Sequence, residues 1–196
     1  MNVWLHRISH PHHKRFQCQL LGDHHLLSTG WSDFGVCPEF HKEVCLNKSQ
    51  DRQDCFERYF KEWGFPKNRW NLWRFIVDMK KGDRVVVPCW RVFSVYEIED
   101  NGVLPVSGIA ASVSGTFALN DNGFLCLPND DKSDDAIAID LGFFRKVRPL
   151  GVRVPRRTYA DEDLTAQLRN RHTTVCMTDL AQNVEEALAA FRQNLN

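Results

Sequence analysis

Residues 71–88, NLWRFIVDMKKGDRVVVP, decide the fold because they hold most of an amphipathic helix, a tight turn and a buried strand in direct succession. Apolar side chains recur at three- and four-residue intervals up to Met79, which is the spacing of one helix face. Two lysines and Gly82 follow, a combination typical of a helix C-terminus. The next residues, RVVVPC (84–89), are rich in β-branched side chains and predict a strand. The sequence therefore predicts a helix, starting near Asn68, that leads directly into a sheet.

A further helix is predicted before this stretch and several strands after it. The earlier helix starts near Ser49 and stops at Gly64, and its aromatic residues fall at helical spacing. After the turn, WRVFSVYEI (90–98) predicts a strand that ends at the sequence Asp-Asn-Gly. The close spacing of turns suggests a small barrel. Further strands are expected at residues 103–110, 116–119, 124–127 and 136–147.

Both ends of the chain add to the same sheet. NVWLHRI (2–8) and HHLLSTGW (24–31) predict strands, and WSDFG then leaves the sheet as a loop. In the tail we expect a helix over 161–171, a strand over 173–176 and a helix from Asp179 with one apolar face. This order of elements predicts an α+β domain over residues 1–178. The last segment, 179–196, is a helix that either docks on the domain or connects it to something else.

The composition is that of a folded protein without a strong overall charge. The chain has 196 residues, 43% hydrophobic and 26% charged, with a formal net charge of zero. A nucleic-acid site, if present, must therefore be local. Residues 143–157 are strongly basic and leave room for a basic face, although the two signs of charge could equally interleave on a solvated surface. We expect no membrane span, no signal peptide, a cytoplasmic location and seven reduced cysteines.

Three segments together resemble the PUA-like superfamily. They are NVWLHRI with LLSTGWSDFG (26–35), the stretch 71–88 with FSVYEI (93–98), and FFRKVRPLGVRVPRR (143–157) with LRNRHTTVCMTDL (168–180). Within the superfamily they are most similar to the EVE-like domains at the N-terminus of Mrr-type modification-dependent restriction enzymes. The resemblance spans nearly the whole chain. It implies a twisted pseudo-barrel sheet flanked by helices and a pocket that receives a flipped base, held by aromatic faces and read along its hydrogen-bonding edge.

The resemblance also assigns roles to residues of this chain. Trp31 would be the cage aromatic, although it could equally be an ordinary core tryptophan. Expected base-binding residues are Trp31, Ser32, Asp33, Asn71, Trp73, Trp90 and Phe93. Burial beneath the sheet is an alternative for Trp73, and sequence cannot choose between Trp90 and Phe93 as a wall. Expected phosphate-binding residues, or otherwise a solvated strand edge, are Arg145, Lys146, Arg148, Arg156 and Arg157.

No catalytic motif is found. The set Cys37, His41 and Cys45 lacks the paired spacing of a zinc site, and phosphate-binding and dinucleotide-binding glycine motifs are absent from the sequence. We therefore expect no enzyme activity, no cofactor and no metal for this chain alone. The expected partner is nucleic acid, with DNA preferred over RNA. The domain would recognise a base as part of a restriction or defence system, in which a nuclease is a fused or separate protein. The alternatives are an RNA-binding version and a protein-interaction scaffold with a degenerate pocket.

Overall fold

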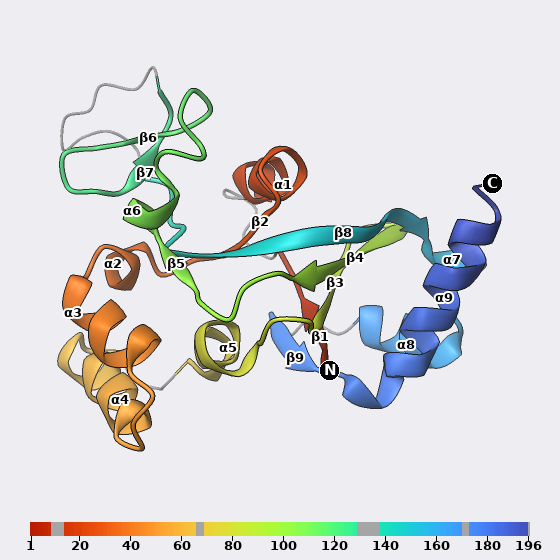
Figure 1. Cartoon of the computed structure of the whole chain (residues 1–196), viewed down its shortest axis with the longest axis horizontal. Helices are drawn as coiled ribbons and strands as arrows, with labels where there is room; N and C mark the ends of the chain where they lie inside the picture. The colour runs from red at the N-terminus through yellow and green to blue at the C-terminus, as the bar shows by residue number, and fades with distance from the viewer. Residues whose placement is uncertain (9–13, 66–68, 129–137, 170–172, 196) are drawn as a thin grey trace.

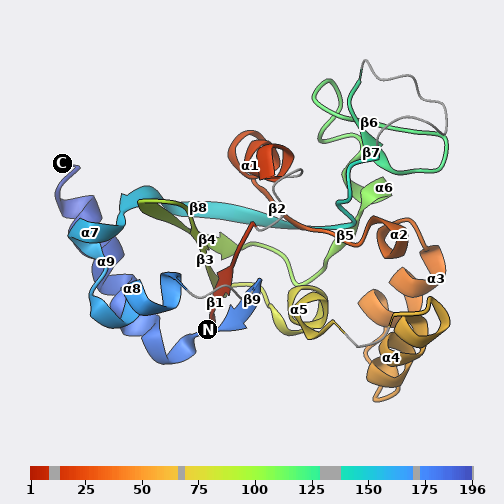
Figure 2. The same cartoon turned by 180° about the vertical axis from the view of Figure 1, so that it is seen from behind.

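The computed structural model describes residues 1–8, 14–65, 69–128, 138–169 and 173–195. These residues form an α+β fold in which a curled sheet, a half-barrel, is flanked by helices (Figure 1). The predicted α+β class with a twisted sheet and flanking helices is confirmed. Figure 2 shows that α2 to α4 lie beyond one end of the sheet and α7 to α9 beyond the other.

The described residues form a seven-stranded sheet in which β1 and β3 are parallel and the other neighbours are antiparallel. The thirteen-residue β8 joins the two halves, because it pairs with β4 along one part and with β2 and β5 along the other. Two further short strands, β6 and β7, pair with each other. In spatial order the main strands are β2 (Leu26–Thr29), β8 (Phe143–Pro155), β4 (Val92–Ile98), β3 (Arg84–Pro88), β1 (Val3–His6) and β9 (Thr174–Cys176); β5 is Leu104–Pro105, β6 Ala118–Leu119 and β7 Leu125–Cys126.

Helices cover both faces of the sheet. The helix predicted near residues 49–63 is α4, and the one expected from residue 68 is α5 followed by a π-helical segment, η2. The helices are α1 (Lys14–Asp23), α2 (Ser32–Gly35), α3 (Pro38–Phe40), η1 (His41–Leu46), α4 (Arg52–Glu62), α5 (Trp70–Trp73), η2 (Arg74–Asp78), α6 (Val106–Ile109), α7 (Arg156–Tyr159), α8 (Glu162–Leu168), η3 (Thr178–Leu180) and α9 (Ala181–Gln193).

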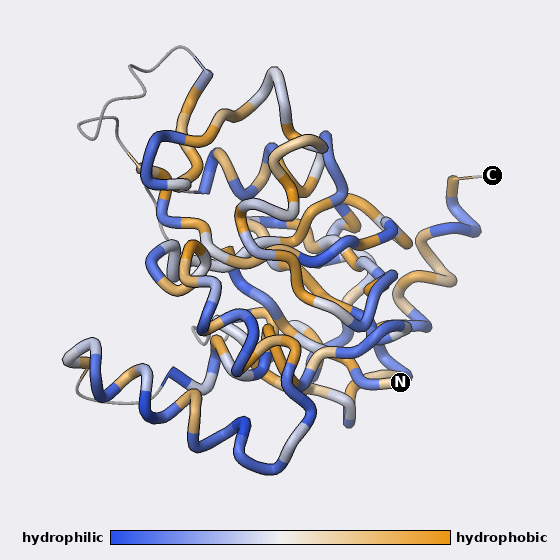
Figure 3. The backbone as a smooth tube through the Cα atoms, turned by 60° about the vertical axis from the view of Figure 1, so that its left-hand side comes forward, coloured by the Kyte–Doolittle hydropathy of each residue, from blue (hydrophilic) through white to orange (hydrophobic). Residues whose placement is uncertain are grey.

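Successive side chains along each strand point to opposite faces of the sheet, and each face packs into its own hydrophobic cluster. In β1, Val3 and Leu5 contribute to a cluster with α8 and α9, whereas Trp4 contributes to an aromatic-rich cluster with α3 to α5. The last helix is docked, because Val184 and Leu188 are fully buried in the first of these clusters. Along this helix, hydrophobic and hydrophilic stretches alternate in Figure 3, as expected for a helix with one buried face.

Two local predictions are wrong, and one helix has no counterpart among the predictions. The expected strand over 103–110 is two residues of β5 followed by α6, because Pro105 begins a helical turn that buries Val106 and Ile109 three residues apart. WSDFG is expected as a loop, but Ser32–Gly35 within it form the short helix α2. The helix α1 was not predicted. The strand expected over 136–147 lies partly outside the described residues and begins at Phe143 in the described part.

Arg145, expected to bind phosphate, is instead part of the core. Its side chain is 1% exposed, and its guanidinium donates to the carbonyl oxygens of Phe75 at 2.6 Å and Ile76 at 3.1 Å. These carbonyls belong to the π-helix η2, whose backbone hydrogen bonds are displaced from the ordinary pattern. Burial lowers the pKa of Arg145 to about 10, which still leaves it charged at neutral pH. The phosphate prediction for Arg145 is therefore wrong, since the group cannot reach solvent.

Candidate functional site

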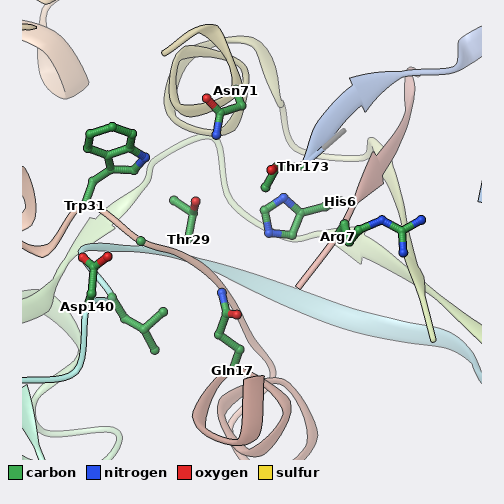
Figure 4. Close-up of a pocket in the computed structure, with 10 residues that line it drawn as sticks. His6, Arg7, Gln17, Thr29, Trp31, Asn71, Asp140 and Thr173 are labelled. Carbon is green, nitrogen blue, oxygen red and sulfur yellow. The ribbon is translucent and has the colours of Figure 1, made fainter. Parts of the chain in front are cut away.

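A cavity of about 250 Å³ lies where the end of β1 meets the end of β2 (Figure 4). Its volume is below the range of roughly 300–1,000 Å³ that is typical of sites for drug-sized ligands, so it suits a single small ring system. The lining combines an indole, amides, hydroxyls and a carboxylate. The lining residues are His6, Arg7, Gln17, Thr29, Gly30, Trp31, Asn71, Asp140, Leu141 and Thr173.

Trp31 is held in a conformation that is unusual for a residue other than glycine. Its backbone is left-handed, with φ 71° and ψ 48°, which costs about 1–2 kcal/mol. Its partly buried ring packs edge-on against Phe60 and Phe65, with ring centroids 5.3 Å apart in both cases. The surrounding aromatic cluster thus stabilises an indole that also borders the cavity.

The loop that carries Trp31 is fixed by the segment leading into β8. The carboxylate oxygen Oδ1 of Asp140 accepts hydrogen bonds from the backbone N–H of Ser32 at 2.9 Å and from its hydroxyl at 3.0 Å. The backbone N–H of Gly142 donates to the carbonyl of Thr29 at 3.0 Å. The two segments approach so closely that a Cβ at Gly142 would overlap the carbonyl oxygen of Trp31. Glycine is therefore required at this position.

His6 closes the gap between the two sides of the half-barrel. Its Nε2 lies 3.1 Å from the carbonyl oxygen of Ser28 in β2, and its Nδ1 lies 3.1 Å from the hydroxyl of Thr174 in β9. A carbonyl can only accept, so Nε2 carries the proton and Nδ1 accepts from the threonine. Burial lowers the pKa of His6 to about 4, which keeps the ring neutral at physiological pH.

Gln17, on α1, lines the cavity and carries a buried acceptor that has no partner within the described part of the chain. Its side-chain Nε2 donates to the carbonyl of Ser28 at 3.2 Å, and the residue is only 6% exposed. Its Oε1 has no hydrogen-bond partner among the residues that the structure describes. A buried acceptor left in this state costs about 1–3 kcal/mol. Figure 4 shows the amide of Gln17 pointing into the space between Trp31 and His6, with Asn71 on the opposite side.

The structure brings together only part of the predicted base-binding set. Trp31 and Asn71 line the cavity, and Ser32 lies directly behind it, bonded to Asp140. Asp33 is exposed and does not line the cavity. The remaining aromatic residues of the predicted set each lie elsewhere in the fold.

Phe93, Trp73 and Trp90 do not form walls of this cavity. Phe93 is fully buried in the cluster on the opposite face of the sheet, so the prediction that it contacts a base is wrong. Trp73 packs against Phe56 and borders a different cavity, where the guanidinium of Arg52 lies 5.8 Å from its ring centre. Trp90 is 81% exposed and lies at a third position, the hairpin between β3 and β4.

The other predicted phosphate-binding residues are spread along and beyond β8. Lys146 is exposed, whereas Arg148 forms an ion pair with Glu97 at 2.7 Å. Arg156 and Arg157 follow β8 and border a hollow with Trp90. None of these four side chains lines the cavity around Trp31.

Several cavity residues gave no signal in the sequence. Gln17, Thr29 and Asp140 are common polar residues in segments that the sequence does not mark as special. His6 is the exception, since a histidine in the apolar strand VWLH is a polar residue placed where burial is expected. The cavity depends on residues up to 167 positions apart in the chain, such as His6 and Thr173.

The described chain offers few other kinds of site. Among the residues that the structure describes, no three His, Cys, Asp or Glu side chains are grouped closely enough to hold a metal ion. All seven cysteines lie in the described part, and none forms a disulfide. No helix formed by the described residues has the length and apolar character needed to cross a membrane.

Comparison with family models, with curated proteins and with solved structures gives no match for this chain.

Proposed function

We propose that this chain is a nucleic-acid reader whose cavity around Trp31 binds a single unpaired base. The observation that carries the proposal is the convergence on one small cavity of Trp31, Asn71 and Gln17, whose buried Oε1 has no partner in the described chain. A buried acceptor without a partner in the described chain is explained if a ligand supplies the donor. A base supplies both a flat aromatic face and several hydrogen-bonding groups along one edge.

The chemistry of the lining fits the proposal on each side of a ring. The indole of Trp31 provides an aromatic surface, and a stacked base is worth about 1–3 kcal/mol. Leu141 provides an apolar contact, which suits a ring or a methyl substituent. The amide of Asn71 can both donate and accept. The site is therefore equipped to position a planar heterocycle and to distinguish its edge.

Two residues that line the cavity carry acceptor oxygens. The Oε1 of Gln17 is buried without a partner in the described chain, and the carboxylate of Asp140 lies at the exposed lip of the cavity. Such groups pair with the exocyclic amino group of cytosine, adenine or guanine. Thymine and uracil carry two carbonyls and one N–H on the same edge, so they satisfy this lining less well. We expect amino-bearing bases to bind more tightly.

The resemblance to EVE-like domains extends the proposal to a modified base in DNA, read for a nuclease partner. The curled half-barrel and the aromatic cluster beside the cavity support this extension. The first alternative function, RNA binding, would place an RNA base in the same cavity. The second, a protein-interaction scaffold, would leave the cavity without a nucleic-acid ligand. Binding experiments distinguish these three possibilities.

The test is a binding titration with nucleosides and with short oligonucleotides that carry cytosine, 5-methylcytosine, 5-hydroxymethylcytosine or N6-methyladenine, in DNA and RNA form. We expect binding that quenches tryptophan fluorescence and that Trp31→Ala weakens by about 1–3 kcal/mol. Trp63→Ala is the matched control, because Phe34 contacts both tryptophans, with ring centroids 6.0 Å from Trp31 and 4.6 Å from Trp63, but Trp63 does not line the cavity. If no oligonucleotide binds more tightly than about 100 μM at low salt, the proposal is wrong.

A further inference from the structure

The most exposed large apolar side chain in the described chain is an indole on a hydrogen-bonded turn. Trp90 is 81% exposed at the tip of the hairpin between β3 and β4. The turn is closed by a hydrogen bond from the backbone N–H of Cys89 to the carbonyl of Val92 at 2.9 Å. A fixed backbone with a solvent-exposed indole is an arrangement in which little entropy is lost when a partner binds.

Three arginines surround this tryptophan. Arg91, Arg156 and Arg157 together with Trp90 line a hollow of about 190 Å³, which we call the Trp90 platform. Arg156 fixes its geometry, because its guanidinium donates to the carbonyl of Trp90 at 3.0 Å and its backbone N–H donates to the carbonyl of Arg91 at 3.0 Å. Within the described chain, none of the three guanidinium groups forms an ion pair, and no acidic residue lines the hollow.

The local positive charge of the Trp90 platform contrasts with the formal net charge of the whole chain. The formal net charge of the chain is zero, yet three positive groups border one hollow and no acidic residue of the described chain is part of its lining. Guanidinium groups bind phosphate oxygens through paired N–H donors, and an exposed indole stacks on a base of any identity. The combination therefore matches one nucleotide unit, a phosphate next to a flat ring.

We propose that the Trp90 platform is a second nucleotide-binding site, which contacts the strand flanking the base held in the cavity around Trp31. The inference rests on the proposed function, since it assigns the path of the strand that delivers this base. It makes the ligand a polynucleotide and not a free nucleoside. It also assigns phosphate binding to Arg91, Arg156 and Arg157 and not to the buried Arg145.

The topology places the platform and the cavity at the same edge of the sheet. Strands β1 and β3 are parallel neighbours, with Leu5 opposite Val86. Arg7 follows β1 and lines the cavity, and Trp90 follows β3 at the corresponding end. Burial lowers the pKa of Arg7, and the positive charge of Arg156 lowers it further. A strand that leaves the cavity past Arg7 therefore meets the platform.

The test compares nucleosides with oligonucleotides of increasing length, using Trp90→Ala and the double variant Arg91→Ala/Arg157→Ala. We expect Trp90→Ala to weaken oligonucleotide binding by about 5- to 100-fold and to leave nucleoside binding unchanged. The double variant should lower the slope of log K against log salt by about 0.7 for each phosphate that the protein no longer neutralises. Because these three side chains lie at the surface, the thermal unfolding midpoint should not change.

Matched controls remove equivalent groups elsewhere. Trp70→Ala removes another tryptophan, 40% exposed, and Lys42→Ala/Lys61→Ala removes two exposed charges. If wild-type protein binds oligonucleotides and the platform variants bind as tightly, with the same salt slope, the inference is wrong while the proposed function stands. If no nucleoside or oligonucleotide binds at all, both are wrong. Trp90-dependent binding to phosphatidylserine vesicles without binding to oligonucleotides would also overturn the inference.

Discussion

Replacing Gln17 with methionine separates a binding role from a structural one. Methionine has a similar length and no hydrogen-bonding amide, so the change removes the unpartnered Oε1 without leaving a large cavity. Removing this unsatisfied acceptor should raise the free energy of unfolding by about 1–3 kcal/mol. Losing the hydrogen bond from Nε2 to the Ser28 carbonyl should lower it by about 0.5–1.5 kcal/mol. That carbonyl is not orphaned, because His6 still donates to it. We expect the free energy of unfolding to stay the same or to rise by about 1 kcal/mol.

The same change should remove a hydrogen bond that the bound base needs. We expect base binding to weaken by about tenfold, which corresponds to one hydrogen bond of about 1–1.5 kcal/mol. The assays are urea denaturation followed by circular dichroism and a calorimetric titration with the best-binding oligonucleotide. Gln19→Met, on the same helix but outside the cavity, is the control. Destabilisation by more than about 2 kcal/mol with unchanged binding would refute the reasoning, because Gln17 would then be a structural residue.

Three further results are expected from the geometry. The pKa of His6 is about 4 in the folded chain and 6.5 without the fold, so between these values the unfolded chain binds more protons. The free energy of unfolding should therefore fall by about 3 kcal/mol as the pH drops from 6.5 to 4, and urea titrations should show a flatter pH profile for His6→Gln. Gly142→Ala should destabilise the fold by about 1–3 kcal/mol, since its Cβ meets the Trp31 carbonyl, and crystallography should show the Trp31 loop displaced. Arg145→Met should lower the free energy of unfolding by about 2–4 kcal/mol in a denaturation assay, because the carbonyls of Phe75 and Ile76 lose their hydrogen-bond donors. The salt dependence of oligonucleotide binding should not change.

The elements that could be predicted from the sequence are those whose signal is local. The stretch 71–88 carries helical spacing, a glycine stop and a β-branched run within a few turns, and the structure follows it closely. The helix α1 was missed because only Phe16, Leu20 and Leu21 mark its apolar side. The β-branched content of residues 103–110 favours a strand, but the tertiary position of Pro105 and the burial of Ile109 select a helical turn.

The candidate site was predictable only at its most distinctive residues. Trp31 and Asn71 follow from the resemblance, and the fold brings them to one cavity across 40 positions of sequence. Phe93 was wrongly placed because alternation in β4 shows that Phe93 and Ser94 face opposite sides but not which side borders the cavity. Gln17 and Asp140 enter through packing between distant segments, which no local pattern encodes.

The pairing of β1 with β9 has a consequence for biosynthesis. Leu5 lies opposite Val175, so β1, which is synthesised early, can pair with β9 only after residue 176 has been synthesised. Thr173, which borders the cavity, belongs to the same late segment. At a translation rate of roughly 5–20 residues per second, the N-terminal strand spends on the order of ten seconds without this neighbour. The cavity around Trp31 is therefore complete only after β9 has left the ribosome, and nascent chains that end before Cys176 should lack the base binding proposed for this cavity.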